Sequence, residues 1–139
     1  MHLLVEDLVR KFNEVGISNE IGRRGQVCSI LAGLNTKKVR NLYAEFLINT
    51  DSEDVGIYVF DIASVMEEHR ADVLEMLNYI NANYRYVRFF VGENDSVCAA
   101  CDVPKTAQDV PATAVELFVR LSQMVDECYP YIMRSMWGA

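Results

Sequence analysis

The sequence predicts an α+β fold in which helices cover one face of an antiparallel sheet. Two β-type runs, residues 86–91 and 96–103, flank the turn sequence 92–95. Pro104 then ends the pairing, because proline has no amide hydrogen to donate to a ladder. A long amphipathic helical pattern follows. A hairpin followed by a long helix is typical of a two-layer α+β domain rather than a parallel α/β sheet.

The first half of the chain adds a helix and three strands. Apolar residues recur at helical spacing over residues 3–15. Three β-type runs follow at residues 26–33, 39–48 and 55–61, and the polar connections between them predict an antiparallel meander.

A second helix is expected to begin at a capping box formed by Ser64 and Glu67 and to end near residue 81. The last helix begins at residues 109–111 and is expected to kink or end at Pro130, with a short amphipathic continuation. The predicted order is therefore α-β-β-β-α-β-β-α, in a domain that spans residues 1–139.

Charge and hydropathy exclude several classes of protein. The net charge of −7 argues against nucleic-acid binding, which needs a clustered basic surface. No apolar run approaches the ~20 residues of a membrane span. The first residues lack a basic cluster and turn acidic at Glu6 and Asp7, so we expect no secretory signal and a cytoplasmic protein. The acidity favours a basic partner segment.

A family resemblance emerges from the second half. The segment VRFFVGENDSVCAACDVP, followed by a long helix with DECYPYIM, resembles the YbjN family, also called putative bacterial sensory transduction regulators. Members show an extended hairpin, a proline-bounded loop and a closing helix with an aromatic–proline pair, here Tyr129 and Pro130. The resemblance implies a fold similar to type III secretion chaperones, which are small acidic dimers that hold partner polypeptides in extended form. It therefore implies a homodimer and supplies no catalytic residues.

Cys98 and Cys101 form a CxxC pair, the one motif in the sequence that is associated with redox activity or metal binding. A redox CxxC works at a helix N-terminus, and a zinc site needs four ligands. This pair lies in a predicted strand, where residues three apart point to opposite faces. We expect both, together with Cys28 and Cys128, to be reduced core residues; a metal or redox role is the alternative.

No other constellation predicts catalysis, a metal or a cofactor. His2 and His69 are expected in solvent, without a nucleophile beside them. Carboxylates gather in two loops, at residues 51–54 and 93–95, without the ordered spacing of a calcium loop. We therefore expect a protein that is not an enzyme and holds no cofactor.

One face of the predicted sheet carries more aromatic side chains than a solvated face needs. Its expected members, which we predict to bind a partner polypeptide, are Tyr43, Leu47, Tyr58, Phe60, Tyr86 and Phe90. The middle helix, a second subunit or a partner could cover this face.

These observations predict a non-catalytic, chaperone-like or regulatory protein that binds a partner polypeptide through the aromatic sheet face. The alternative is a small-molecule sensor or an enzyme with a pocket between the sheet and the helices. The sequence does not identify the partner.

Overall fold

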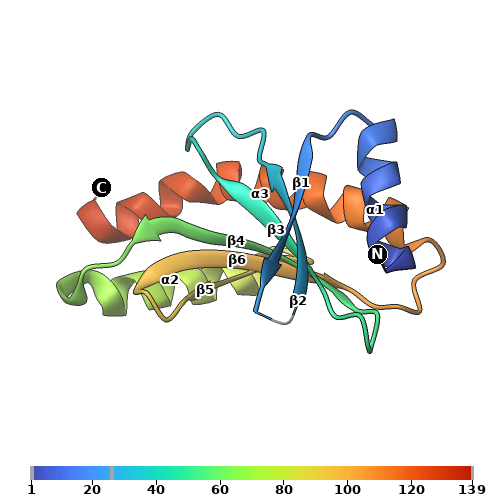
Figure 1. The fold of residues 1–139 in the computed structure, drawn as a ribbon. Coiled ribbons are helices and arrows are strands. Elements are labelled where there is room, and N and C mark those ends of the chain that lie inside the picture. Colours follow the sequence, from blue (N-terminus) through green and yellow to red (C-terminus); the bar gives the residue numbers. More distant parts are fainter. Residues whose placement is uncertain (1, 26, 139) are drawn as a thin grey trace.

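A computed structural model describes residues 2–25 and 27–138 and confirms the α+β fold class (Figure 1). In chain order the elements are α1 (Leu3–Glu14), β1 (Asn19–Arg24), β2 (Val27–Gly33), β3 (Tyr43–Ile48), β4 (Val55–Ser64), the 3-10 turn η1 (Glu67–His69), α2 (Arg70–Asn83), β5 (Arg88–Val91), β6 (Ser96–Val103) and α3 (Val110–Trp137). Gln26, which begins the predicted strand 26–33, lies outside the described residues.

The strands form one six-stranded antiparallel sheet in the order β1-β2-β3-β4-β6-β5. The predicted meander is therefore correct, and β6 joins the closing hairpin to it through β4. The sheet twists strongly, because β1 and β2 cross the direction of β4 and β6 in Figure 1. The two chain ends lie at opposite ends of the molecule.

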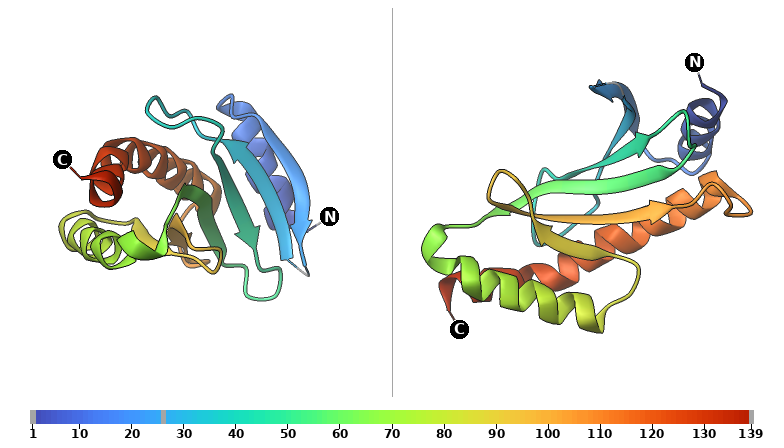
Figure 2. Two further views of the ribbon diagram at one scale, coloured as in Figure 1. Left: turned by 90° about the vertical axis from the view of Figure 1, so that its left-hand side faces the viewer. Right: turned by 90° about the horizontal axis from the view of Figure 1, so that it is seen from below.

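The core lies between the sheet and the three helices. Alternate residues of β3 and β4 are buried against helical side chains, and the ring of Phe46 packs 4.7 Å from Phe12 of α1 and 5.8 Å from Phe118 of α3. Helix α3 runs behind the strands in Figure 1, and α2 lies alongside α3 in both views of Figure 2. We call the helix-covered side the inner face and the opposite side the outer face.

Strand β1 is absent from the predicted order and is a correction to it. Its sequence, NEIGRR, has one apolar residue, so no period-2 pattern marks it as a strand. All six of its residues nevertheless pair with β2. Pairing to a neighbour thus determines this strand, whose charged residues suit a sheet edge.

The predicted capping box at Ser64 is wrong. Ser64 ends β4 and pairs with Ser96, because β6 is long enough to extend its partner strand to this point. The chain then makes the short η1 turn, and α2 begins at Arg70. Its last residue is Asn83, two positions beyond the predicted end.

Pro130 does not end the last helix, and α3 continues to Trp137. Ile132 and Met136, on the turns beyond the proline, are buried at 0% and 3% exposure. The free energy gained by burying these side chains offsets the cost of the backbone hydrogen bond that proline cannot make.

Helix α2 does not cover the outer face, so the middle helix is not the cover of the aromatic residues. It packs on α3 and beside β5, the last strand of the sheet. The outer face therefore has no helical cover within the described residues.

Among the described helices, none combines the length and the apolar character that a membrane span requires.

Candidate functional site

The outer face brings together five of the six predicted binding residues. Tyr58 and Phe60 alternate with the buried residues of β4, and Tyr43 and Leu47 alternate with those of β3. Phe90 lies opposite Cys98, on the same side as the Arg88–Ala100 pair. Tyr43 is exposed at 57%, and the other four are half-buried.

Tyr86 does not share this face. It lies before β5 with a φ of 72°, and its ring packs under the guanidinium of Arg120, a residue of α3, at 5.1 Å. The positive φ ends the period-2 alternation from which its face was predicted. Tyr86 is therefore on the helical side of the molecule.

Two arginines flank a pair of stacked rings on the outer face. Tyr58 and Phe60 stack with ring centroids 5.5 Å apart and planes 5° from parallel. The guanidinium of Arg24 lies 4.7 Å from the centroid of Phe60, and that of Arg88 lies 5.9 Å from Tyr58. The side chains therefore follow one another in the order Arg24, Phe60, Tyr58 and Arg88, and this row of rings has a positive charge at each end.

Each of these arginines is held by a carboxylate. Arg24 donates two hydrogen bonds to Glu45, at 2.6 and 2.8 Å, and this bond raises the pKa of Arg24. Arg88 donates to Asp102 at 2.7 Å. Burial by itself lowers the pKa of Arg88, but the hydrogen bond and charge of Asp102 outweigh it and the net shift is upward. Both guanidinium groups therefore stay charged and fixed over the rings.

The outer face is concave. Arg24 is on β1 and Phe60 is on β4, and two strands lie between them in the sheet. Neighbouring strands are about 4.8 Å apart, so the edge strand β1 must curl over the outer face toward β4 for these side chains to touch.

Two hollows open on this concave face and share Phe60 and Asp61. The first measures about 670 Å³ and is lined by Tyr43, Glu45 and Leu31 among others. The second measures about 460 Å³ and extends from Arg24 past Phe90 to the β5–β6 turn. A groove thus runs from β1 and β3 to the β5–β6 hairpin.

Asp61 lies at the point where these hollows meet, and the backbone there is irregular. The register of β4 against β6 shifts between Val59 and Ala63, and Asp61 has a φ of 56°. The carboxylate of Asp61 accepts a hydrogen bond from the Ser96 hydroxyl at 2.7 Å. The bulge re-aims the side chain and bends β4.

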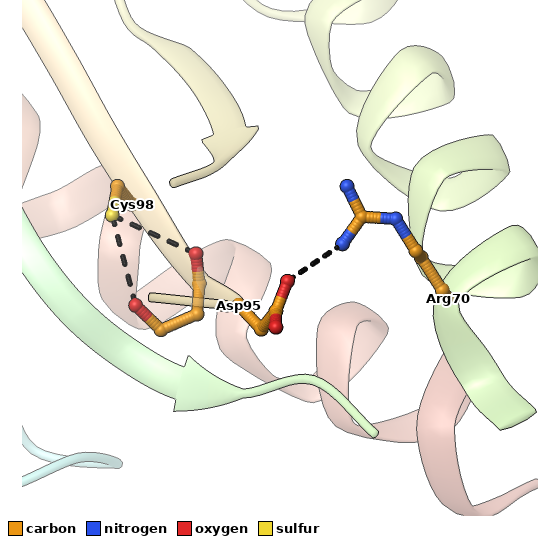
Figure 3. Close-up of polar contacts among 4 residues, drawn as sticks. Arg70, Asp95 and Cys98 are labelled. Carbon is orange, nitrogen blue, oxygen red and sulfur yellow. Dashed lines mark hydrogen bonds and ion pairs between the residues drawn. The ribbon is translucent and has the colours of Figure 1, made fainter. Parts of the chain in front are cut away.

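The hairpin turn at the end of the groove is fixed to α2. Asp95 accepts a hydrogen bond from Arg70 at 3.0 Å, and its backbone carbonyl accepts one from the Val65 amide at 2.8 Å. Figure 3 shows this ion pair and, on the other side of Asp95, Cys98. The Cys98 thiol lies 3.9 Å from the hydroxyl of Ser96 and 3.7 Å from its carbonyl oxygen. The turn therefore has a defined position relative to the outer face.

The cysteine pair lies as its strand position predicts. Cys101 points into the core, and Cys98 is on the outer side beneath Gly92, opposite Phe90. Burial raises the pKa of the Cys101 thiol to about 12 and that of Cys128 to about 11. All four cysteines are free. Raised thiol pKa values oppose the thiolate form that redox chemistry needs.

The histidines make structural contacts rather than lying free in solvent. The Nδ1 atom of His2 accepts a hydrogen bond from the Leu4 amide at 3.1 Å and so caps α1. The ring of His69 lies edge-on to Trp137 at 5.3 Å. Within residues 2–25 and 27–138, no cluster of three histidine, cysteine or acidic side chains is placed to hold a metal ion.

A further hollow of about 660 Å³ lies between α1 and the sheet, where a small-molecule sensor would hold its ligand. His2, Arg23 and Thr50 are the polar side chains of its lining, and Val5, Ile21 and Cys28 are among the other lining residues.

Sequence reasoning missed the two arginines, Asp61 and the curl of the sheet. Arg88 lies two residues before Phe90 in β5, so the face that they share could have been found from the sequence. Arg24 could not, because β1 itself was not predicted.

Comparison with known proteins decides the family. Residues 40–132 match the family model "YbjN: Putative bacterial sensory transduction regulator". The chain belongs to the YbjN family.

A solved structure agrees in fold. The structure titled "Crystal structure of YbjN, a putative transcription regulator from E. coli" matches with a TM-score of 0.63 and 13% identity, covering 94% of this chain and 96% of that one. No curated protein matches the sequence. The family description names a regulator and no enzymatic activity.

Proposed function

We propose that this YbjN-family member is a non-catalytic regulatory protein that binds a partner polypeptide along the concave outer face. The observation that carries the proposal is the pair of hollows that meet at Phe60 and Asp61, on a face that no helix covers in the described ranges 2–25 and 27–138. The two hollows follow each other across the strands, so together they offer the elongated site that an extended segment needs.

The side chains of the groove suit a peptide with both apolar and charged residues. Tyr43, Phe60 and Phe90 offer aromatic contact area, which is enriched at binding hot spots. Asp61, Glu20 and Glu93 line the same hollows, and the chain carries a net charge of −7. A basic segment is therefore the favoured partner, and its binding should weaken as salt rises.

The experiment uses two tyrosines of similar exposure on opposite sides of the molecule. Tyr43 lies in the groove at 57% exposure, and Tyr86 lies on the helical side at 65%. A photo-crosslinking residue placed at each position in turn is activated in the native cell, and the attached polypeptides are identified by mass spectrometry.

We expect a crosslinked polypeptide at position 43 that is absent at position 86. The purified polypeptide should then bind Tyr43→Ala about tenfold or more weakly than wild type, and Tyr86→Ala unchanged. Equal crosslinking at both positions, or equal affinity of both variants, would count against the outer face as the binding surface.

A further inference from the structure

A second groove lies on the helical side, between α2 and the C-terminal half of α3. The two helices pack antiparallel, because His69 before α2 contacts Trp137 at the end of α3, while the Tyr84 hydroxyl after α2 lies 3.3 Å from a Glu127 carboxylate oxygen. Figure 2 shows the C-terminal end of α3 beside the beginning of α2. The groove between their outer sides has a volume of about 860 Å³.

A stripe of α2 and the C-terminal end of α3 line this groove. The α2 side presents His69, Asp72, Met76 and Tyr79, at spacings of three and four residues. The other side is formed by Tyr131 and by the last turn of α3, from Arg134 to Trp137, with Gly138 beyond it. Tyr79 is exposed at 57% and Trp137 at 62%. Two large aromatic side chains therefore remain in solvent where a third helix could pack between two existing ones.

The rim of the groove is acidic. Asp72 and Glu75 line it, and Glu67 and Glu68 lie just before α2. In the part of the chain that the structure describes, none of these four carboxylates takes part in an ion pair. The lining contains a single arginine, Arg134, whose guanidinium lies 5.6 Å from the ring of Tyr131.

We propose that this groove binds an amphipathic helical segment of a partner protein, with apolar anchors on one face and lysine or arginine beside them. Tyr79 lies ten positions after His69, which at 1.5 Å per residue is about 15 Å, or nearly three helical turns of contact. Apolar anchors at helical spacing are the ordinary way in which a groove between helices holds a third. The acidic rim selects the basic flanks.

This proposal does not rest on the outer-face proposal, because the two grooves share no residue. Trp137 makes it directly testable. It is the only tryptophan of the chain and lines the groove, so its fluorescence reports on occupancy without a label.

The probe is a synthetic peptide of about 14 residues, near the length at which an isolated helix becomes stable, with leucines on one helical face and lysines on the other. Titration should shift the Trp137 emission to shorter wavelength and reduce its quenching by acrylamide. A peptide of the same pattern with glutamate in place of lysine should change neither signal.

Charge variants separate this groove from general attraction to an acidic protein. Asp72→Asn with Glu75→Gln should weaken binding of the lysine peptide about three- to tenfold. Asp51→Asn with Glu53→Gln removes the same charge from the β3–β4 loop and should leave binding unchanged. Tyr79→Ala should also weaken it, and Leu74→Ala, an exposed α2 residue outside the lining, should not.

Three outcomes would overturn the proposal. They are no change in Trp137 fluorescence with the lysine peptide, equal binding of the glutamate peptide, and equal weakening by both charge variants. A shift of Trp137 emission that follows the concentration of the protein alone would assign the groove to a second copy of the chain instead.

Discussion

The side chain of Asn81 pairs with both backbone groups of Phe89. Its amide nitrogen donates to the Phe89 carbonyl at 2.9 Å, and its oxygen accepts from the Phe89 amide at 2.8 Å. Asn81 is in α2 and Phe89 is in β5, which ends the sheet. One side chain therefore takes the place of the next strand at this edge and closes it to further pairing.

Replacement of Asn81 should destabilise the fold. Asn81→Ala leaves a donor and an acceptor of a half-buried edge strand without partners, so we expect a loss of about 1–3 kcal/mol in the free energy of unfolding by urea. Asn83→Ala is the matched control, because its amide bonds only the exposed Tyr79 carbonyl, and should cost less than about 0.5 kcal/mol. Equal losses in the two variants would contradict the role of Asn81.

Gly56 keeps room for the aromatic stack. A Cβ at this position would lie 2.7 Å from a ring carbon of Tyr58, which is shorter than any van der Waals contact. Gly56→Ala should therefore displace Tyr58 from Phe60, at a cost of about 1–3 kcal/mol. Gly33→Ala, also in a strand, meets its nearest neighbour at 3.9 Å and serves as the control. Thermal unfolding would measure both, and a Gly56 variant as stable as the Gly33 variant would disprove the close approach.

Asp126 anchors the connection between β2 and β3. Its carboxylate accepts from the Lys37 amide at 2.8 and 3.0 Å and from the Lys38 amide at 2.9 Å. Asp126→Ala should speed hydrogen exchange at these amides, because both lose their acceptor. Glu127→Gln changes the neighbouring carboxylate and should leave them protected. Unchanged exchange in Asp126→Ala would show that the loop keeps its place without this carboxylate.

Stability should fall in alkaline solution through the buried thiols. Folding raises the pKa of Cys101 from 9.0 to about 12 and that of Cys128 to about 11, so the folded state keeps protons that the unfolded chain loses. The contribution is fully present below pH 9 and is lost as the pH rises toward these folded values. Urea unfolding between pH 8 and 11 should show this slope, and Cys101→Ala with Cys128→Ala should flatten it. An equal slope in that variant would assign the alkaline loss to other groups.

The sequence predicted the elements that have a regular apolar pattern and missed those that depend on a neighbour. Helix α1 and strand β6 have such a pattern, and both were placed correctly. Strand β1 has none and forms because β2 pairs with it. Ser64 has the local signature of a helix cap, but pairing with Ser96 overrides it.

The site shows the same division. Alternation in β3 and β4 placed Tyr43, Tyr58 and Phe60 on one face. No sequence pattern contains the positive φ of Tyr86, or the curl of the sheet that brings Arg24 over Phe60.

The two ends of the sheet differ, and this difference bears on assembly. Asn81 closes the β5 edge, whereas the free edge of β1, opposite β2, has no strand partner within the described residues. We propose a homodimer in which two β1 strands pair antiparallel and join the sheets. A symmetric interface of this kind, with the side chains that flank β1, should bury roughly 800 Å² per subunit. Light scattering at micromolar concentration should give twice the 15.8 kDa chain mass, and hydrogen exchange in β1 should slow as concentration rises. A monomer across that range would refute the dimer, and a dimer with unprotected β1 amides would place its interface elsewhere.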